Sequence, residues 1–273
     1  TCLVSATLCD VFPHMYSHKI IAALSTLRPI GLDAISSVLF MNRIDTKYVF
    51  SIRKLEDLIN NLNGKYQVLD ICNMRALPYR TIYMDTSEFL FYYQHVRGEL
   101  ERLKIRFRIY ESSGTTFLEI KKKTNKNRTI KIRIENNFST GSFDDNAINF
   151  IKEHTYVDST QVKPVIVNQF TRATLIGLKS NERVTMDYNI SFSGTFNEEH
   201  VEMPYLAIVE LKKEGYSSRS PFNIILKQMG IHPTRFSKYC AGLSILNNSL
   251  RKNNLKPGLL LLNKIENEYN KSY

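Results

Sequence analysis

Charged residues of types that bind phosphate recur at every second position along several strand-like segments of the chain. Lys104, Arg106 and Arg108 alternate with apolar residues over 103–110. Successive side chains of a β-strand point to opposite faces, so this segment has one basic face and one apolar face. Arg offers a planar fork of hydrogen-bond donors and Lys a point charge, and both suit phosphate oxygens. The alternation recurs at Arg43, Asp45 and Lys47; at Glu119, Lys121 and Lys123; at Thr129, Lys131 and Arg133; at Arg183, Thr185 and Asp187; and at Glu210 and Lys212.

The inner position of these faces is inferred from their composition. An antiparallel sheet with one face in water explains any single segment. Six segments together favour another arrangement, because water-exposed faces usually mix both signs of charge and these faces are mainly basic. If helices cover the apolar faces from outside, the basic faces line the inside of a closed barrel. A polyanion would offset the repulsion among those cations, and the few carboxylates indicate a divalent cation with oxygen ligands.

Turn residues and hydrophobic periodicity predict the elements that carry these faces. Short turn-forming segments join consecutive strands, which favours antiparallel pairing. We therefore predict an α+β fold, a closed eight-stranded antiparallel β-barrel with a basic lumen and peripheral helices. One domain would cover 41–250, between a helical extension (1–40) and a tail (251–273). Strands are expected over 42–50, 79–85, 103–110, 116–123, 128–134, 164–176, 182–192 and 205–213, and helices within 20–40 and over 54–62, 143–154, 220–229 and 238–250.

Length and charge narrow the classes of function. The chain has 273 residues, 43% of them hydrophobic, which is enough for a real core and excludes a disordered protein. Its formal net charge of +11 predicts a polyanionic partner. Nucleic acid is not expected, because the basic residues alternate within strands and do not form an exposed stripe with stacking aromatics. The apolar runs fall short of the ~20 residues of a membrane span. The four cysteines lack zinc spacing and are too few for a disulfide framework, which favours reduced cysteines and a cytoplasmic location.

Nine short segments also follow one another in a recognisable order. They are Arg43-Ile44-Asp45-Thr46-Lys47-Tyr48, Tyr83-Met84-Asp85-Thr86, Lys104-Ile105-Arg106-Phe107-Arg108, Glu119-Ile120-Lys121-Lys122-Lys123, Arg128-Thr129-Ile130-Lys131-Ile132-Arg133, Phe170-Thr171-Arg172, Glu182-Arg183-Val184-Thr185-Met186-Asp187, Val209-Glu210-Leu211-Lys212 and Phe236-Ser237-Lys238-Tyr239. Together they cover about residues 40–243. In this order they resemble the VTC (vacuolar transporter chaperone) domain, the polyphosphate polymerase branch of the CYTH-like triphosphate tunnel metalloenzymes.

The resemblance implies a triphosphate tunnel whose basic residues hold a triphosphate or a growing polyphosphate, with Mn²⁺ or Mg²⁺ as cofactor. Other tunnel enzymes open with Glu-x-Glu-x-Lys, whereas this chain has Arg43-x-Asp45-x-Lys47, which favours the polymerase branch. Phe170 stands where the eukaryotic polymerase has a tyrosine. Carried over by position, the catalytic residues are Arg106, Arg108, Arg172 and Arg183, the phosphate-binding residues are Arg43, Lys47, Lys121, Lys123, Lys131, Ser237 and Lys238, and the metal ligand is Glu210.

The leading hypothesis is an ATP-dependent polyphosphate polymerase, a phosphotransferase that acts on ATP with phosphate, pyrophosphate or polyphosphate as acceptor. One alternative is hydrolysis of triphosphate or polyphosphate in the same tunnel, and another is a polyphosphate-binding module without turnover. Asp45 and Asp187 are either metal ligands or ion-pair partners of the cations. Glu119 is better explained as an ion-pair partner of Lys121 or Arg133. His95 is expected to be structural, and which of Lys121 and Lys123 is the main phosphate ligand stays open.

The eukaryotic members of the family also carry a phosphate-sensing SPX domain and membrane helices. Neither is found in this sequence, which favours a stand-alone, bacterial member. Residues 1–27 and the tail after Leu250 match no part of the motif series. They are candidates for docking a partner protein or a membrane assembly.

Overall fold

The computed structural model describes residues 16–33, 43–125, 128–136, 138, 143–195, 199–214 and 220–271. Its strands are β1 (Arg28–Ile30), β2 (Arg43–Ser51), β3 (Tyr66–Leu69), β4 (Leu77–Thr86), β5 (Arg102–Tyr110), β6 (Thr115–Lys123), β7 (Thr129–Glu135), β8 (Val162–Gly177), β9 (Glu182–Gly194), β10 (His200–Met203) and β11 (Leu206–Glu214). Its α-helices are α1 (Ser17–Ser25), α3 (Leu55–Leu62), α4 (Leu90–Arg97), α5 (Asp145–His154), α6 (Pro221–Gln228), α7 (Lys238–Leu246) and α8 (Lys256–Asn270).

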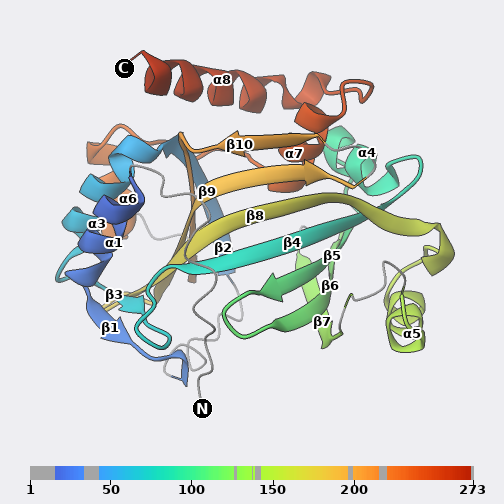
Figure 1. Ribbon diagram of the computed structural model, residues 1–273, viewed down its shortest axis with the longest axis horizontal. Helices are drawn as coiled ribbons and strands as arrows, with labels where there is room; N and C mark the ends of the chain where they lie inside the picture. The colour runs from blue at the N-terminus through green and yellow to red at the C-terminus, as the bar shows by residue number, and fades with distance from the viewer. Residues whose placement is uncertain are drawn as a thin grey trace.

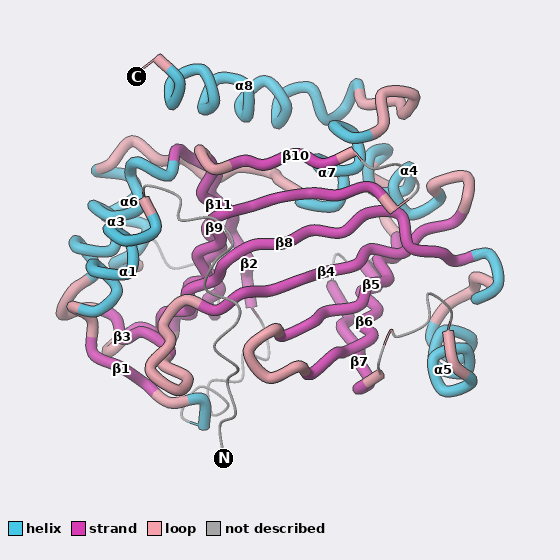
Figure 2. The backbone as a smooth tube through the Cα atoms, in the orientation of Figure 1, coloured by secondary structure: helices cyan, strands magenta, loops and turns pink. Residues whose placement is uncertain are grey.

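One strongly curled sheet organises the molecule (Figure 1). Its main path runs β2-β11-β9-β8-β4-β5-β6-β7, with antiparallel neighbours throughout. At its margins β10 pairs with β9, β3 pairs with β8, and β1 pairs in parallel with β3. The predicted α+β class and the eight antiparallel strands are therefore confirmed. Figure 2 shows how far these strands bend around a common concave side.

The predicted closure of the barrel is wrong for the part of the chain that is described. β2 and β7 end the path and do not pair with each other there, so the sheet is an open half-barrel. Both edge strands carry cations in the phosphate-binding series, Lys47 on β2 and Lys131 on β7. Each of these cations is paired on its own side of the opening, Lys47 with Glu210 and Lys131 with Glu119, so neither needs the opposite edge for its counter-charge.

Helices cover the convex face of the sheet in two groups. Helices α1, α3 and α6 share one apolar core with the outward residues of β9 and β11, among them Met186 and Val209. Helix α5 shares a second core with β5 and β6, where Phe107 and Leu118 are fully buried. The alternation therefore works as predicted in these strands, with apolar residues under helices and charged residues on the other face.

Helix α7 lies on the same side of the sheet as the cations and fills part of the concavity. It packs against β8 and β9, in a core that also contains Phe192. The approach requires glycine, because a Cβ at Gly242 would lie 2.3 Å from Cδ1 of Phe192. Ser237 caps this helix by accepting a hydrogen bond from the backbone N–H of Cys240. The N-terminus of α7 is thereby fixed beside the charged face.

Helix α4 owes its position to one buried carboxylate. Asp85, at the end of β4, accepts hydrogen bonds from the backbone N–H groups of Thr86, Phe91 and Tyr92 and from the hydroxyl of Tyr239. Burial raises the pKa of Asp85, although these four donors counteract the rise. The carboxylate thus replaces a local cap and ties α4 to α7.

The segments outside 41–250 pack against the rest of the molecule. Ile20 and Leu24 of α1 are buried in the core under α3, and Leu262 and Ile265 of α8 are buried in the core around α7. Figure 1 shows α8 lying across the molecule beside β10 and α7. The division at 40 and 250 stays a prediction.

Two findings bear on the expected location. Among the residues that are described, no helix is long and apolar enough to cross a bilayer. The expectation that the cysteines are reduced is wrong for Cys72, which is disulfide-bonded, whereas Cys240 is free and buried. A cytoplasmic location stays a prediction.

Candidate functional site

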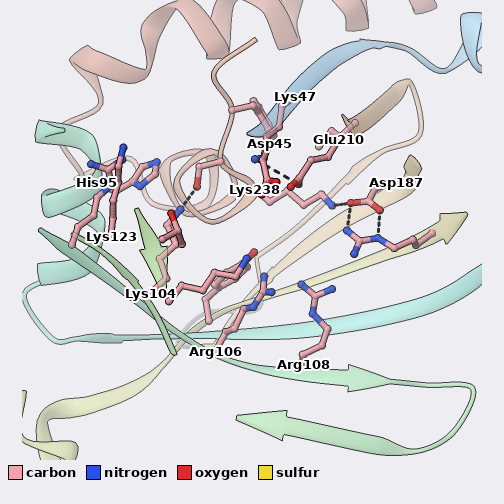
Figure 3. A pocket seen from close by; sticks show the side chains of 18 residues that line it. Asp45, Lys47, His95, Lys104, Arg106, Arg108, Lys123, Asp187, Glu210 and Lys238 are labelled. Carbon is pink, nitrogen blue, oxygen red and sulfur yellow. Dashed lines mark hydrogen bonds and ion pairs between the residues drawn. The ribbon is translucent and has the colours of Figure 1, made fainter. Parts of the chain in front are cut away.

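A cavity of about 420 Å³ opens on the concave side of the sheet. The cations come from strands far apart in the chain. In Figure 3, Lys104, Arg106 and Arg108 lie along one side, opposite Lys47, Glu210 and their neighbours. Three carboxylates line the cavity, from Asp45, Asp187 and Glu210. The nine cations that line it are Lys47, Arg102, Lys104, Arg106, Arg108, Lys121, Lys123, Arg172 and Lys238.

The first charge cluster joins β5, β6 and β7. Arg106 faces Glu119 directly across the strand pair, and its Nε and Nη2 lie 2.8 and 2.6 Å from a Glu119 carboxylate oxygen. The ammonium of Lys131 pairs with the other oxygen. Burial alone would raise the pKa of Glu119, but Arg106 and Lys131 hold it well below its usual range. Glu119 is therefore an ion-pair residue, as favoured from the sequence, although its partners differ from those expected.

The second cluster joins β8, β9 and α7. Arg172 lies across from Asp187, and its Nε and Nη2 donate to the two carboxylate oxygens at 2.6 and 2.7 Å. Lys238 binds the same carboxylate from the first turn of α7. The pKa of Lys238 is lowered to about 7. Burial is the main cause and the charge of Arg172 adds to it, while Asp187 partly opposes both.

The third cluster joins β2 and β11. Lys47 and Glu210 are paired across the two strands, with Nζ 3.5 Å from a carboxylate oxygen. Lys212 also binds Glu210, and its Nζ lies 3.3 Å from Asp45. Burial would raise the pKa of Glu210, but Lys212 and Lys47 hold it well below its usual value. Glu210 and Asp45 thus share one ammonium group, that of Lys212.

Three of the cavity cations, Arg108, Lys121 and Lys123, have no such partner among the described residues. Neither Arg108, which is only 5% exposed, nor Lys121 makes a hydrogen bond or ion pair with any residue in the described ranges. Burial lowers the pKa of Arg108 to about 10, together with the charges of Arg106 and Arg172. The charge of Arg106 and burial hold the pKa of Lys121 well below normal. Buried cations without counter-ions are costly, so the positions of Arg108 and Lys121 both favour a bound anion.

Ser237 and Lys104 occupy the middle of the cavity. Lys104 Nζ donates to Ser237 Oγ at 3.1 Å, beside the N-terminus of α7. Burial lowers the pKa of Lys104 to about 8, and the nearby Lys47 contributes. Oriented N–H groups at a helix N-terminus add a partial positive charge, so α7 strengthens an anion site here.

The structure brings together most residues that the family resemblance singled out. Lysines 121 and 123 both line the cavity, and Lys123 also lines a second chamber at its mouth. Lys131 reaches the site through Glu119 without lining the cavity. Arg183 lies on β9 four residues before Asp187 and does not line it. Arg43 opens β2, but its side chain is outside the described part.

Two further lining residues, Arg102 and His95, were not assigned to the site from the sequence. Arg102 lies one alternation step before Lys104 on β5, so extending that pattern by two residues would have found it. His95, which was expected to be structural, comes from α4 and lines the cavity. Burial and the charges of Lys104 and Arg102 lower the pKa of His95 to about 3, so it is neutral.

A second chamber of about 810 Å³ shares residues with the cationic cavity, including Lys47, His95 and Lys123. Its remaining wall is partly apolar and comes from α4 and from the segment around α8, with Val96, Leu255 and Leu259 among its members. The C-terminal segment thus shapes the mouth of the site.

The three carboxylates of the cavity are the candidate ligands of the expected Mn²⁺ or Mg²⁺. Within the described ranges no group of three or more His, Cys, Asp or Glu could hold a metal ion. Asp45 and Glu210, however, converge on one ammonium group, that of Lys212. Mg²⁺ commonly binds to one or two carboxylates and completes its octahedron with waters and substrate phosphates. The donor set fits an ion that arrives with a phosphate substrate.

The sequence matches the VTC domain family over residues 42–247. The chain belongs to this family. All the lining cations of the cavity lie within the matched part, whereas helix α8 lies after it. No curated protein matches this VTC protein.

Among solved structures, similar chains have low sequence identity. A "putative adenylate cyclase" from Bacillus halodurans is 15% identical, with a TM-score of 0.48, over 72% of this chain and 94% of its own. The PH1819 protein from Pyrococcus horikoshii OT3 is 15% identical, with a TM-score of 0.43, over 76% and 99%. A Hippeastrum protein described as having a dominant triphosphatase activity is 12% identical, with a TM-score of 0.44, over 75% and 97%.

Proposed function

We propose that this VTC protein is a metal-dependent polyphosphate polymerase that transfers the γ-phosphate of ATP to a growing polyphosphate chain. One observation carries the proposal: nine cations line a single cavity with three carboxylates, and Arg108 and Lys121 lack any counter-ion among the described residues. A linear chain of phosphates supplies negative charge at each step along such a cavity. Membership of the VTC family supports the same class of ligand.

The state of the cavity's bases supports transfer to an anionic acceptor over hydrolysis. Hydrolysis benefits from a base that takes a proton from water. Asp187, Glu210 and Asp45 are all tied to cations. His95 is a weak base, because its pKa lies near 3. A phosphate or polyphosphate acceptor is already ionised and needs no base, so these residues suit phosphoryl transfer to it.

The arginines would do most of the chemical work by positioning and neutralising the transferred group. Arg108 has its donors free, and Arg106 and Arg172 flank it while held by Glu119 and Asp187. Guanidinium groups around a metaphosphate-like transition state spread the charge of its oxygens. Lys238 and Lys104 become charged as the anion enters, since a nearby negative charge raises their pKa values. Lys121, Lys123 and Lys47 would extend the binding track.

Glu210 would hold Mn²⁺ or Mg²⁺, with Asp45 as its neighbour. When bound, such an ion supplies charge neutralisation between adjacent phosphates. Lys212 and Lys47 hold the pKa of Glu210 well below its usual value, which favours the ionised state that a metal ligand requires.

The test is incubation of the purified protein with ATP and Mn²⁺, followed by a gel stained for polyphosphate. Wild type should give a ladder of chains and release ADP. Lys121→Gln should reduce chain formation at least tenfold, whereas Lys264→Gln, which removes a lysine with a 72% exposed side chain on α8, should not. ADP with free phosphate and no chains would indicate hydrolysis. Tight polyphosphate binding without ATP consumption would indicate a binding module.

A further inference from the structure

Two aromatic residues stack at the end of the cavity where the unpaired arginine lies. Tyr79 on β4 and Phe170 on β8 are direct cross-strand neighbours. Their ring centroids are 5.6 Å apart and their planes differ by 6°. Neither ring lines the cavity, and Phe170 is buried. The two rings therefore do not contact a ligand in the cavity directly, and they can act on it only through the cavity residues that lie over them.

Three cavity cations lie over these rings. The Cζ of Arg108 is 5.6 Å from the Tyr79 centroid and 5.4 Å from that of Phe170. The Cζ of Arg172 is 5.3 and 5.1 Å from the same two centroids. The Nζ of Lys238 is 3.7 Å from the Phe170 centroid. All five distances fall within the range of cation–π attraction.

The three cations share too little negative charge from carboxylates. Asp187 binds Arg172 and Lys238, and it makes no hydrogen bond or ion pair with Arg108. The negative faces of the two rings therefore supply the remaining attraction, most of all for Arg108. A ring face differs from a carboxylate in one important respect. It attracts the guanidinium from above its plane and leaves the N–H donors, which lie in that plane, free.

We propose that the Tyr79–Phe170 pair is a positioning platform that holds Arg108, and with it Arg172 and Lys238, in place for phosphate while leaving the donors of Arg108 unoccupied. A carboxylate in the same place would hold Arg108 equally well but would compete with the phosphate. The platform rests on the proposed function only in that it requires a phosphate ligand in the cavity. It does not require turnover.

The test is calorimetric binding of inorganic triphosphate without metal to wild type, Phe170→Leu and Phe170→Tyr. Leu keeps the apolar bulk and loses the ring face, so Phe170→Leu should bind about tenfold more weakly, the effect of losing one to two kcal/mol of cation–π attraction. Phe170→Tyr keeps the face and should bind like wild type. Phe150→Leu, a matched change of a buried Phe on α5, should also bind like wild type.

A double-mutant cycle separates positioning from general damage. In an Arg108→Gln background, Phe170→Leu should lose most of its effect on triphosphate affinity, because the guanidinium that the ring chiefly positions is absent. Equal affinities of wild type and Phe170→Leu, or an undiminished effect in the Arg108→Gln background, would overturn the platform and leave the proposed function intact. Absence of triphosphate binding by wild type would overturn both.

Discussion

Triphosphate binding should take up protons, and Lys238 should supply the largest share. Burial lowers its pKa to about 7 and that of Lys104 to about 8. At pH 8 about nine-tenths of Lys238 and about half of Lys104 are then neutral before binding. An anion at hydrogen-bond distance raises both pKa values toward the ordinary one, so about 1.4 protons should enter with each ligand at pH 8. About 0.9 of these belong to Lys238.

The direction of the pH dependence follows from this uptake. Both pKa values are higher in the complex than in the free protein, so the affinity is greatest below pH 7 and falls as the pH rises through 7 and 8. Each neutral lysine contributes up to about tenfold per pH unit. Isothermal titration calorimetry in buffers of different ionisation enthalpy measures the protons taken up, with inorganic triphosphate and no metal.

Two variants isolate the share of Lys238 from the protons that the ligand itself takes up. Arg at this position is always charged and Gln never is, so Lys238→Arg and Lys238→Gln should each take up about 0.9 fewer protons than wild type at pH 8. Between pH 7 and pH 9, Lys238→Arg should lose less affinity than wild type, because only Lys104 still titrates there, whereas Lys238→Gln should bind weakly throughout. If all three proteins take up the same number of protons at pH 8, the assignment of a depressed pKa to Lys238 is refuted.

Three further outcomes are expected from the charge clusters and the C-terminal helix. Glu210→Gln should abolish the gain in triphosphate affinity that Mn²⁺ confers. Metal-free binding should stay intact, because Lys47 and Lys212 lose a competing carboxylate. Calorimetry with and without Mn²⁺ measures this gain, and a retained gain would exclude Glu210 as the metal ligand. Glu119→Gln should cost about 3 kcal/mol of unfolding free energy at pH 7, since it leaves Arg106 and Lys131 unpaired. The stability from Glu119 is present above its ordinary pKa and is lost as the pH falls through the lowered one, so urea titrations of the variant should lack that acid-dependent loss. Leu262→Ala should cost about 3 kcal/mol in the same assay, because Leu262 is 2% exposed under α8, and an unchanged value would mean that α8 is not part of the folded core.

The strands could be predicted because their alternation is a local property. Over β5 and β6 the apolar and charged positions have a period of two, and the structure keeps that division between core and cavity. β7 has the same period, but it is an edge strand and leaves Ile130 51% exposed. β3 and β10 have only four residues each, too few for the period to show. α4 was missed because its cap is not local: Phe89, in its N-cap position, makes no side-chain hydrogen bond there, and Asp85 binds the first turn from the preceding strand.

The residues of the cavity could be predicted better than their contacts. Arg172 and Asp187 pair because the register of β8 against β9 places them opposite each other. The register between two strands cannot be read from the pattern of residues along either strand. The same holds for Glu119, whose partner Arg106 lies on a neighbouring strand. Arg183 has the right face and lies too far along β9, because the cavity spans only part of the concave side. Helix α7 fills another part of the concave side. This packing is a tertiary contact, and the alternation of residues along a strand does not predict it.

The most direct test of the account follows the fate of a labelled phosphate. The protein is incubated with Mn²⁺ and ATP labelled with ³²P at either the γ or the α position, and the polyphosphate fraction is separated by size. The account predicts labelled chains from γ-labelled ATP, none from α-labelled ATP, and one ADP for each phosphate incorporated. Recovery of all the γ label as inorganic phosphate, or of none of it outside ATP, would contradict the polymerase.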